Sequence, residues 1–250
     1  MHRLVLGFWG FTLACGGGAN RAGGGQEQAA ASAAAAPAGG ATITGTVSFT
    51  GTPPQNPVID MSEEPTCKAK YTEPPRDPVV VVSDGKLANV FVRVTSGLAT
   101  GASYPTPQTP VALDQNGCLY HPRVLSVMAS QEIQIRNGDA VLHNIKAVPT
   151  ANRGFNISQP TQGMASSRTF SQPEVAIPVE CSVHSWMHAR VFVMEHPYFA
   201  TSGTDGSFRI TGLPAGTYTL EAWHETLGTR TATVTVTDGG TATVSLAFGA

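Results

Sequence analysis

The sequence has few cationic residues and no cluster of Lys and Arg. Its 250 residues include 15 Lys and Arg against 17 Asp and Glu, which gives a formal net charge of -2 at pH 7. Binding to a nucleic-acid backbone requires a concentrated positive surface. The composition therefore excludes nucleic acid as a partner. With 41% hydrophobic residues, the chain still has enough apolar side chains for one or two compact domains.

Long apolar runs are also missing. The N-terminal apolar stretch Leu4–Ala14 is shorter than the ~20 residues that a membrane-spanning helix needs. It follows the positive residue Arg3, so residues 1–14 are predicted to be an export signal peptide. The chain is therefore expected to leave the cytoplasm.

A cysteine directly follows this predicted signal. Leu13-Ala14-Cys15 resembles the lipobox of bacterial lipoproteins, although Thr12 stands where that family prefers a branched aliphatic residue. The resemblance implies that Cys15 carries the lipid and anchors the protein to a bacterial membrane, in the periplasm or at the cell surface. The alternative is ordinary signal cleavage nearby, with Cys15 lost. Residues 15–41 are mostly Gly, Ala, Ser and Gln and are expected to form a disordered tether.

Long helical periodicity is absent after the tether, where short β-branched and aromatic segments alternate with turn residues. The segments predicted to be strands include 43–49, 79–82, 90–94, 131–137, 140–148, 175–179 and 190–194. Near the C-terminus, Val234 and Val236 are predicted to pair with 244–248 as a hairpin across Asp238-Gly239-Gly240. The pattern predicts an all-β protein.

The last fifty residues form a separate block. The runs Thr204–Ile210 and Leu213–Leu220 resemble the carboxypeptidase regulatory-like, transthyretin-like sandwich of bacterial surface proteins. The resemblance implies a smaller β-sandwich over 197–250. Such a sandwich is expected to be a binding or spacer module without chemistry of its own. Such modules open with a Gly-x-Val strand, and Thr44-Gly45-Thr46-Val47 is the one candidate. We therefore hypothesise a discontinuous module in which 42–97 pairs with the C-terminal block around an inserted domain.

A group of metal-binding residue types lies between two predicted strands. The sequence Cys181-Ser182-Val183-His184-Ser185-Trp186-Met187 places a thiol, an imidazole and a thioether at intervals of three. Residues three apart in a strand point to opposite faces, so these side chains converge only if the chain curls around one point. A trigonal His2Cys set with a weak axial Met is typical of copper, whereas zinc prefers four strong ligands.

The second imidazole that such a site needs is provided by His143. His143-Asn144-Ile145 followed by the Cys-x2-His-x2-Met loop resembles the cupredoxin family of blue-copper proteins, with the loop spacing of its amicyanin branch. The resemblance covers 124–194 and implies a Greek-key cupredoxin sandwich within 42–196. It also implies that His143, Cys181, His184 and Met187 bind one type 1 copper ion. Asn144 is expected to hydrogen-bond the ligand loop.

The remaining cysteines suggest a disulfide. With Cys15 lipidated and Cys181 on copper, Cys67 and Cys118 remain as a pair in an oxidising compartment. Two separate thiols, or a second metal site formed by Cys118 and His121, are the alternatives.

The expected function is single-electron transfer by copper to an unidentified redox partner protein. By resemblance to cupredoxins, the exposed edge of His184 would be the electron port and Trp186 part of the apolar docking surface. Enzyme activity is not expected, because copper reductases and oxidases need a second copper centre and no His-x-His pair occurs. The alternatives are a copper-trafficking protein without electron transfer and a surface β-sandwich scaffold.

Overall fold

The computed structural model of the chain describes residues 39–249. The predicted signal peptide, the predicted lipidation site Cys15 and residues 15–38 of the predicted tether lie outside the described residues. The first strand begins at Ala41, which is the last residue of the predicted tether. No helix among the described residues is long and apolar enough to cross a membrane.

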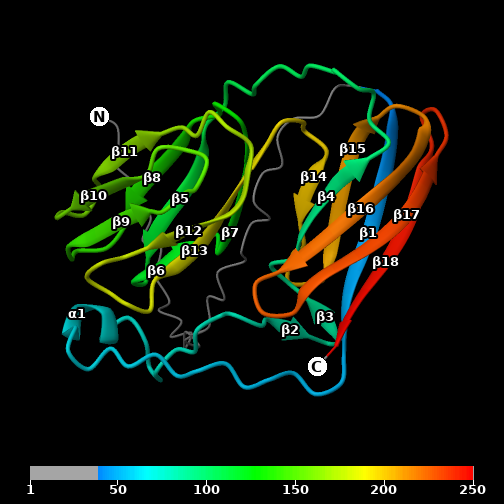
Figure 1. Cartoon of the computed structure of the whole chain (residues 1–250). Helices are drawn as coiled ribbons and strands as arrows, with labels where there is room; N and C mark the ends of the chain where they lie inside the picture. Colours follow the sequence, from blue (N-terminus) through cyan, green and yellow to red (C-terminus); the bar gives the residue numbers. More distant parts are fainter. Residues whose placement is uncertain (1–38, 250) are drawn as a thin grey trace, which may run out of the picture.

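The described chain is almost entirely β, which confirms the predicted fold class. It contains one short helix, α1 (Pro65–Lys68). The strands are β1 (Ala41–Thr50), β2 (Val82–Ser83), β3 (Lys86–Leu87), β4 (Phe91–Ser96), β5 (Val111–Asn116), β6 (Leu119–His121), β7 (Val124–Met128), β8 (Ile133–Asn137), β9 (His143–Ala147), β10 (Phe155–Gln159), β11 (Ala165–Arg168), β12 (Glu174–Glu180), β13 (His188–Met194), β14 (Phe199–Thr201), β15 (Ser207–Leu213), β16 (Gly216–His224), β17 (Gly228–Val236) and β18 (Thr241–Gly249). They form two β-sandwiches that lie side by side (Figure 1).

Strands β5 to β13 form one sandwich, here called the insert sandwich. Its five-stranded sheet has the order β10-β9-β12-β13-β7, and its four-stranded sheet has the order β11-β8-β5-β6. The apolar faces of the two sheets enclose a single core, in which residues such as Leu113, Ile135 and Ile145 are almost completely buried. Strands β5, β8 and β9 alternate buried with more exposed positions, as expected for sheets with one solvated face.

The other strands form a second sandwich, here called the split sandwich because the insert interrupts it in sequence. Strand β1 pairs antiparallel with β15 and parallel with β18, so residues from the two ends of the described chain share one sheet. This is the pairing that the discontinuous-module hypothesis requires. Gly45 permits a close contact, because a Cβ atom there would lie 2.1 Å from the ring of Phe208 on β15. With β1 to β4 included, the split sandwich also has one five-stranded and one four-stranded sheet.

The predicted C-terminal hairpin is wrong. Strand β17 pairs with β16 in one sheet, whereas β18 crosses to the other sheet and pairs with β1. The turn at Asp238-Gly239-Gly240 therefore connects two sheets instead of two neighbouring strands. Val234 and Phe248 still meet in the same core, but they approach it from opposite sheets. The alternation of apolar residues and the turn residues predict β17 and β18 correctly. They contain no information about which sheet each strand joins.

The two sandwiches meet through a small apolar cluster and a set of ion pairs. The rings of Phe91 on β4 and Phe192 on β13 stack with their centroids 4.0 Å apart. Beside them, the buried guanidinium of Arg123 forms ion pairs with the carboxylates of Asp77 and Glu225, the latter at 2.8 Å.

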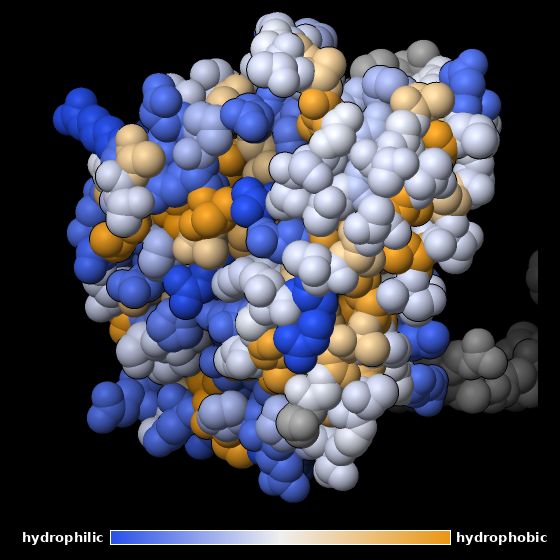
Figure 2. Space-filling model, turned by 45° about the vertical axis from the view of Figure 1, so that its right-hand side comes forward, coloured by the Kyte–Doolittle hydropathy of each residue, from blue (hydrophilic) through white to orange (hydrophobic). Residues whose placement is uncertain are grey.

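On the face drawn in Figure 2, hydrophobic residues are scattered in small groups among hydrophilic ones.

One long connection of the split sandwich reaches across to the insert sandwich. After β1, residues 56–77, here called the strap, leave the split sandwich, and the chain returns to it at β2. The base of the strap is closed by backbone bonds from Ile59 to Pro75 and from Asp77 to Pro57, at 2.8 and 2.9 Å. Its buried residues Ile59, Met61 and Cys67 belong to the core of the insert sandwich. The predicted copper domain of 42–196 is thus smaller in the structure, where its strands lie between 111 and 194 and only the strap is added from earlier residues.

Candidate metal centre

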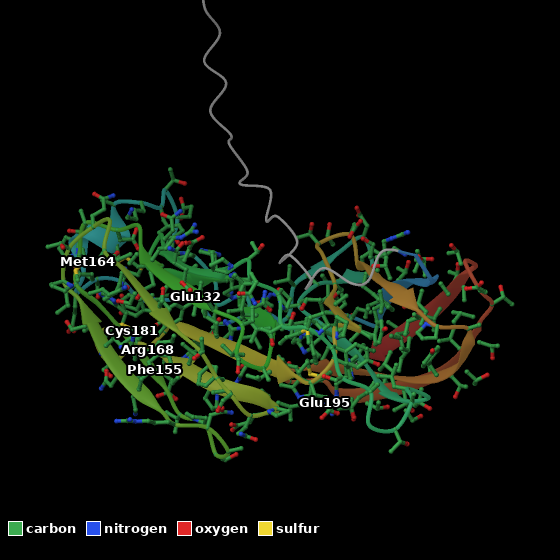
Figure 3. All side chains as sticks on the ribbon, turned by 90° about the horizontal axis from the view of Figure 1, so that it is seen from above. Glu132, Phe155, Met164, Arg168, Cys181 and Glu195 are labelled. Atoms are coloured by element: carbon green, nitrogen blue, oxygen red, sulfur yellow. A yellow bond between two sulfur atoms is a disulfide. The ribbon has the colours of Figure 1, made fainter. Side chains whose placement is uncertain are left out.

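The loop between β12 and β13 curls tightly around one point. The backbone N–H of Cys181 donates to the carbonyl of Met187 at 3.2 Å, and that of Met187 donates to the carbonyl of His184 at 3.0 Å. The N–H of His184 donates to the Cys181 sulfur at 3.4 Å. These bonds hold the three predicted ligands in one turn. Figure 3 shows Cys181 toward the outer part of the insert sandwich, away from Glu195 at the junction.

Three of the four predicted ligands bring their donor atoms together. The Nδ1 atoms of His143 and His184 lie 3.1 Å apart, and Nδ1 of His184 lies 3.7 Å from the Cys181 sulfur. All three side chains are buried, and their ligand atoms lie within 4.8 Å of one another. Donors bonded to one ion at about 2 Å are separated by roughly 3 to 4 Å. His143, Cys181 and His184 can therefore form a metal site.

The fourth predicted ligand, Met187, is fully buried in the same core cluster as Cys181. Asn144 lies where the predicted supporting residue is needed. Its backbone N–H donates to the Cys181 sulfur at 3.4 Å, and its side-chain oxygen accepts the N–H of Ser182 at 3.1 Å. Asn144 thus connects the strand that carries His143 with the loop that carries the other ligands.

The surroundings of Cys181 favour the thiolate. Burial opposes ionisation of this thiol, but hydrogen bonds from His143 and His184 outweigh burial and lower its pKa to about 5. The side chain is therefore ionised at neutral pH, and the thiolate is the form that binds metals. Cys181 is also the one free cysteine within residues 39–249.

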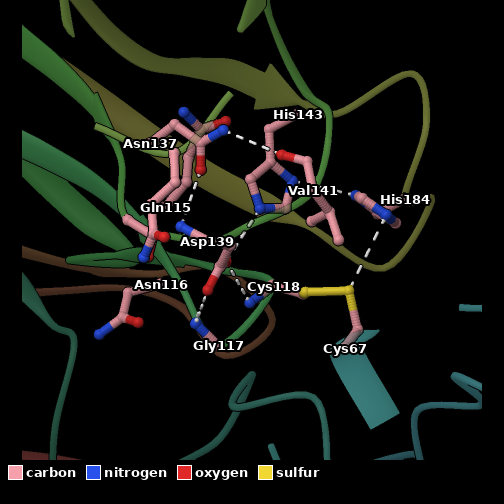
Figure 4. Close-up of polar contacts among 12 residues, drawn as sticks. Cys67, Gln115, Asn116, Gly117, Cys118, Asn137, Asp139, Val141, His143 and His184 are labelled. Carbon is pink, nitrogen blue, oxygen red and sulfur yellow. Dashed lines mark hydrogen bonds and ion pairs between the residues drawn. A yellow bond between two sulfur atoms is a disulfide. The ribbon is translucent and has the colours of Figure 1, made fainter. Parts of the chain in front are cut away.

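Asp139, which was not predicted as a site residue, orients His143. Its carboxylate accepts a bond from Nε2 of His143 at 2.9 Å, so Nδ1 of that ring is left to face the other ligands (Figure 4). The same carboxylate accepts the backbone N–H groups of Gly117 and Cys118 and pairs with Lys70 at 2.8 Å. Burial opposes ionisation, but the bonds from His143 and Lys70 keep the pKa of Asp139 well below its ordinary value. The position of Asp139, four residues before His143, is the feature of the sequence that could have identified it as a supporting residue.

The predicted exposed edge of His184 is not present. The residue is 2% exposed, and its Nε2 atom faces the strap, 3.5 Å from a carboxylate oxygen of Glu64 and 4.0 Å from the sulfur of Cys67. Trp186 packs beside the ring, with centroids 5.2 Å apart, and its indole N–H donates to the Cys118 carbonyl. The prediction of an open His184 port is therefore wrong, because a segment distant in sequence covers this ligand.

The structure joins Cys67 and Cys118 in a disulfide, with their Cα atoms 5.7 Å apart. Cys118 is therefore not available for the alternative second metal site with His121. The ring of His121 instead contacts the carbonyl of Asn116 at 3.1 Å. The disulfide fixes α1 of the strap to the insert sandwich next to His184.

Comparison with known protein families gives one match. The carboxypeptidase regulatory-like domain matches residues 187–249. This region is about a quarter of the chain and includes β14 to β18 of the split sandwich, but not β1 to β4. No curated protein matches the chain.

Solved structures similar to the chain include copper proteins. A copper-containing nitrite reductase from Thermus scotoductus SA-01 is 22% identical, with a TM-score of 0.33, over 40% of this chain and 25% of the reductase chain. A purple cupredoxin from Nitrosopumilus maritimus is 21% identical, with a TM-score of 0.30, over 35% of this chain and all of its own. A Cu(I) form of a mutant amicyanin is 20% identical, with a TM-score of 0.30, over 41% of this chain and 98% of its own. Each match covers less than half of this chain.

Proposed function

We propose that the protein binds a single copper ion in a type 1 site and carries single electrons. The observation that carries this proposal is the convergence of one cysteine sulfur and two histidine Nδ1 atoms at a buried point, with Met187 buried in the same loop. Thiolate and imidazole are strong ligands for copper, and a thioether is a weak axial one. When bound, copper would supply the one-electron Cu(I)/Cu(II) couple.

The chain's own residues are arranged to receive this ion. Cys181 provides the thiolate, and the N–H groups of Asn144 and His184 point at its sulfur. Asp139 fixes the ring of His143 with Nδ1 facing the other donors. Because the donor atoms of His143, Cys181 and His184 lie within 4.8 Å of one another at a buried point, we expect the site to rearrange little between oxidation states. Met187 is proposed as the weak axial ligand that tunes the potential.

A copper-trafficking role without electron transfer is a weaker candidate. A carrier that passes its ion to a partner needs an accessible ligand, and both histidines and the cysteine are buried here. The burial of His184 under the strap favours an ion that stays in place. A role for the split sandwich as a spacer or binding scaffold is compatible with electron transfer.

We propose further that the protein is exported, anchored to a bacterial membrane through Cys15, and not an enzyme. The Cys67–Cys118 disulfide supports export, because disulfides persist mainly in oxidising compartments. The partner would be a second redox protein that exchanges one electron with the site at the membrane surface.

Copper stoichiometry and protein voltammetry test this function. The purified protein should bind one copper ion per chain and give a reversible one-electron wave. Copper binding without a reversible wave would support the trafficking alternative, and absence of copper binding by folded protein would refute both.

A further inference from the structure

The side of the metal centre formed by His184 is closed by the strap. The strap places Glu64 and α1 directly over this ligand, although both lie more than a hundred residues before it in the sequence. It is held in place at several points around the site. Cys67 is bonded to Cys118, Tyr71 donates its hydroxyl to the Gly117 carbonyl at 2.6 Å, and Lys70 pairs with Asp139.

The contact between Glu64 and His184 involves the one ring nitrogen that does not face the other ligands. Nδ1 of His184 is turned toward His143 and Cys181, so Nε2 points outward. A carboxylate oxygen of Glu64 lies 3.5 Å from this Nε2 atom. A histidine that binds a metal through one nitrogen carries its proton on the other, and a nearby carboxylate orients the ring through that proton.

The arrangement gives each imidazole its own carboxylate. Asp139 accepts a hydrogen bond from Nε2 of His143, and Glu64 faces the Nε2 atom of His184. The two carboxylates differ in origin. Asp139 precedes β9 within the insert sandwich, whereas Glu64 is provided by a segment that belongs in sequence to the split sandwich. The connection between β1 and β2 thus adds a residue to a site that is otherwise formed by the insert sandwich.

We propose that Glu64 is a positioning residue for His184, and that the strap is a fixed cover that separates this ligand from solvent and from a docking partner. This inference rests on the proposed copper function. Glu64 accepts a hydrogen bond from the Nε2–H group of His184 and holds the ring with Nδ1 toward the ion. Because the strap covers the His184 edge, electrons enter and leave by another side of the insert sandwich.

Two measurements on the full chain loaded with Cu(I), which is diamagnetic, test the role of Glu64. The first is solvent exchange of the His184 Nε2 proton, followed by NMR with ¹⁵N-labelled histidine. The second is Cu(I) affinity, measured by competition with a chromogenic chelator. In Glu64→Ala, proton exchange should become at least about tenfold faster and the affinity about 10- to 100-fold weaker, as is usual when the partner of a metal-bound histidine is lost.

Glu63→Ala is the matched control, because Glu63 is the exposed neighbour on the same strap and its loss removes the same charge. It should leave both measurements within about twofold of the wild type. Glu64→Gln keeps an acceptor oxygen and should restore most of the affinity lost in Glu64→Ala. Glu64 is 30% exposed, so none of these variants removes a core residue.

The outcomes separate the two proposals. If the folded wild-type protein does not bind copper, the proposed function is refuted. If it binds copper normally and Glu64→Ala behaves like Glu63→Ala in both measurements, the copper function stands and the role of Glu64 is refuted. Fast solvent exchange of the His184 Nε2 proton in the wild-type protein would refute the cover.

Discussion

Removal of the Cys67–Cys118 disulfide should weaken both the fold and the cover of the metal centre. The two cysteines are 51 residues apart in sequence. The loop that the disulfide closes contains the end of the strap, β2 to β4 of the split sandwich, and β5. In the chain-entropy model, a loop of this length restricts the unfolded state by about 14 cal/mol/K, or about 4 kcal/mol at 25 °C. We expect Cys67→Ala/Cys118→Ala to lose about that much free energy of unfolding.

Urea unfolding of the copper-free protein measures this loss. Copper must be absent, because an ion that binds only the folded state adds stability of its own. Far-UV circular dichroism and tryptophan fluorescence should both be recorded, since the two sandwiches can unfold separately. Thr66→Ala is a suitable control, because Thr66 lies on α1 beside Cys67 and is exposed.

A loss below about 1 kcal/mol would contradict this reasoning, because it would show that the strap is held by its packing and polar contacts alone. Those contacts include the buried side chains of Ile59 and Met61 and the hydroxyl of Tyr71. A loss near 4 kcal/mol would show that the covalent bond is the main fixed point of the strap.

Three further predictions concern single residues. Asp139→Asn should weaken copper binding about 10- to 100-fold in a competition assay, because His143 loses its carboxylate partner, whereas Asp114→Asn, at a half-buried position on β5, should not. Burial lowers the pKa of His224 to about 4, below the ~6.5 of an unfolded chain, so its contribution to stability is complete above pH 6.5 and falls as the pH drops toward 4. The wild type should therefore lose about 2 kcal/mol more than His224→Gln between pH 7 and pH 5 in urea unfolding. Gly45→Val should destabilise the split sandwich by about 1 to 3 kcal/mol in the same assay, because the added side chain meets the Phe208 ring, and an unchanged midpoint would contradict the β1 to β15 packing.

Most residues of the proposed copper site could be predicted from the sequence because they lie close together in it. Cys181, His184 and Met187 lie within seven residues, and few ions suit a thiolate, imidazoles and a thioether together. His143 was found by its strand context and its neighbour Asn144. The apolar and β-branched segments also predicted β8, β9, β12 and β13 of the insert sandwich, whereas β5 and β7 were not predicted.

The surroundings of the site could not be predicted in the same way. The apolar residues of the strap follow neither a helical nor a strand period. Nothing in its own residues therefore indicates that it crosses to the insert sandwich. The covering of His184 by Glu64 depends on a contact over 120 residues of sequence. The predicted Cys67–Cys118 pair was the one signal that could have placed residues near Cys67 at the metal centre.

The visible and electron paramagnetic resonance spectra of the purified protein with Cu(II) test the central claim most directly. The wild type should show a strong thiolate-to-copper absorption band, and Ser185→Ala, in the same loop, should retain it. Cys181→Ser should lose the band while the protein stays folded, because the one free thiol of the described chain is gone. A folded wild-type protein without this band, or a Cys181→Ser variant that keeps it, would contradict the assignment of a blue-copper site.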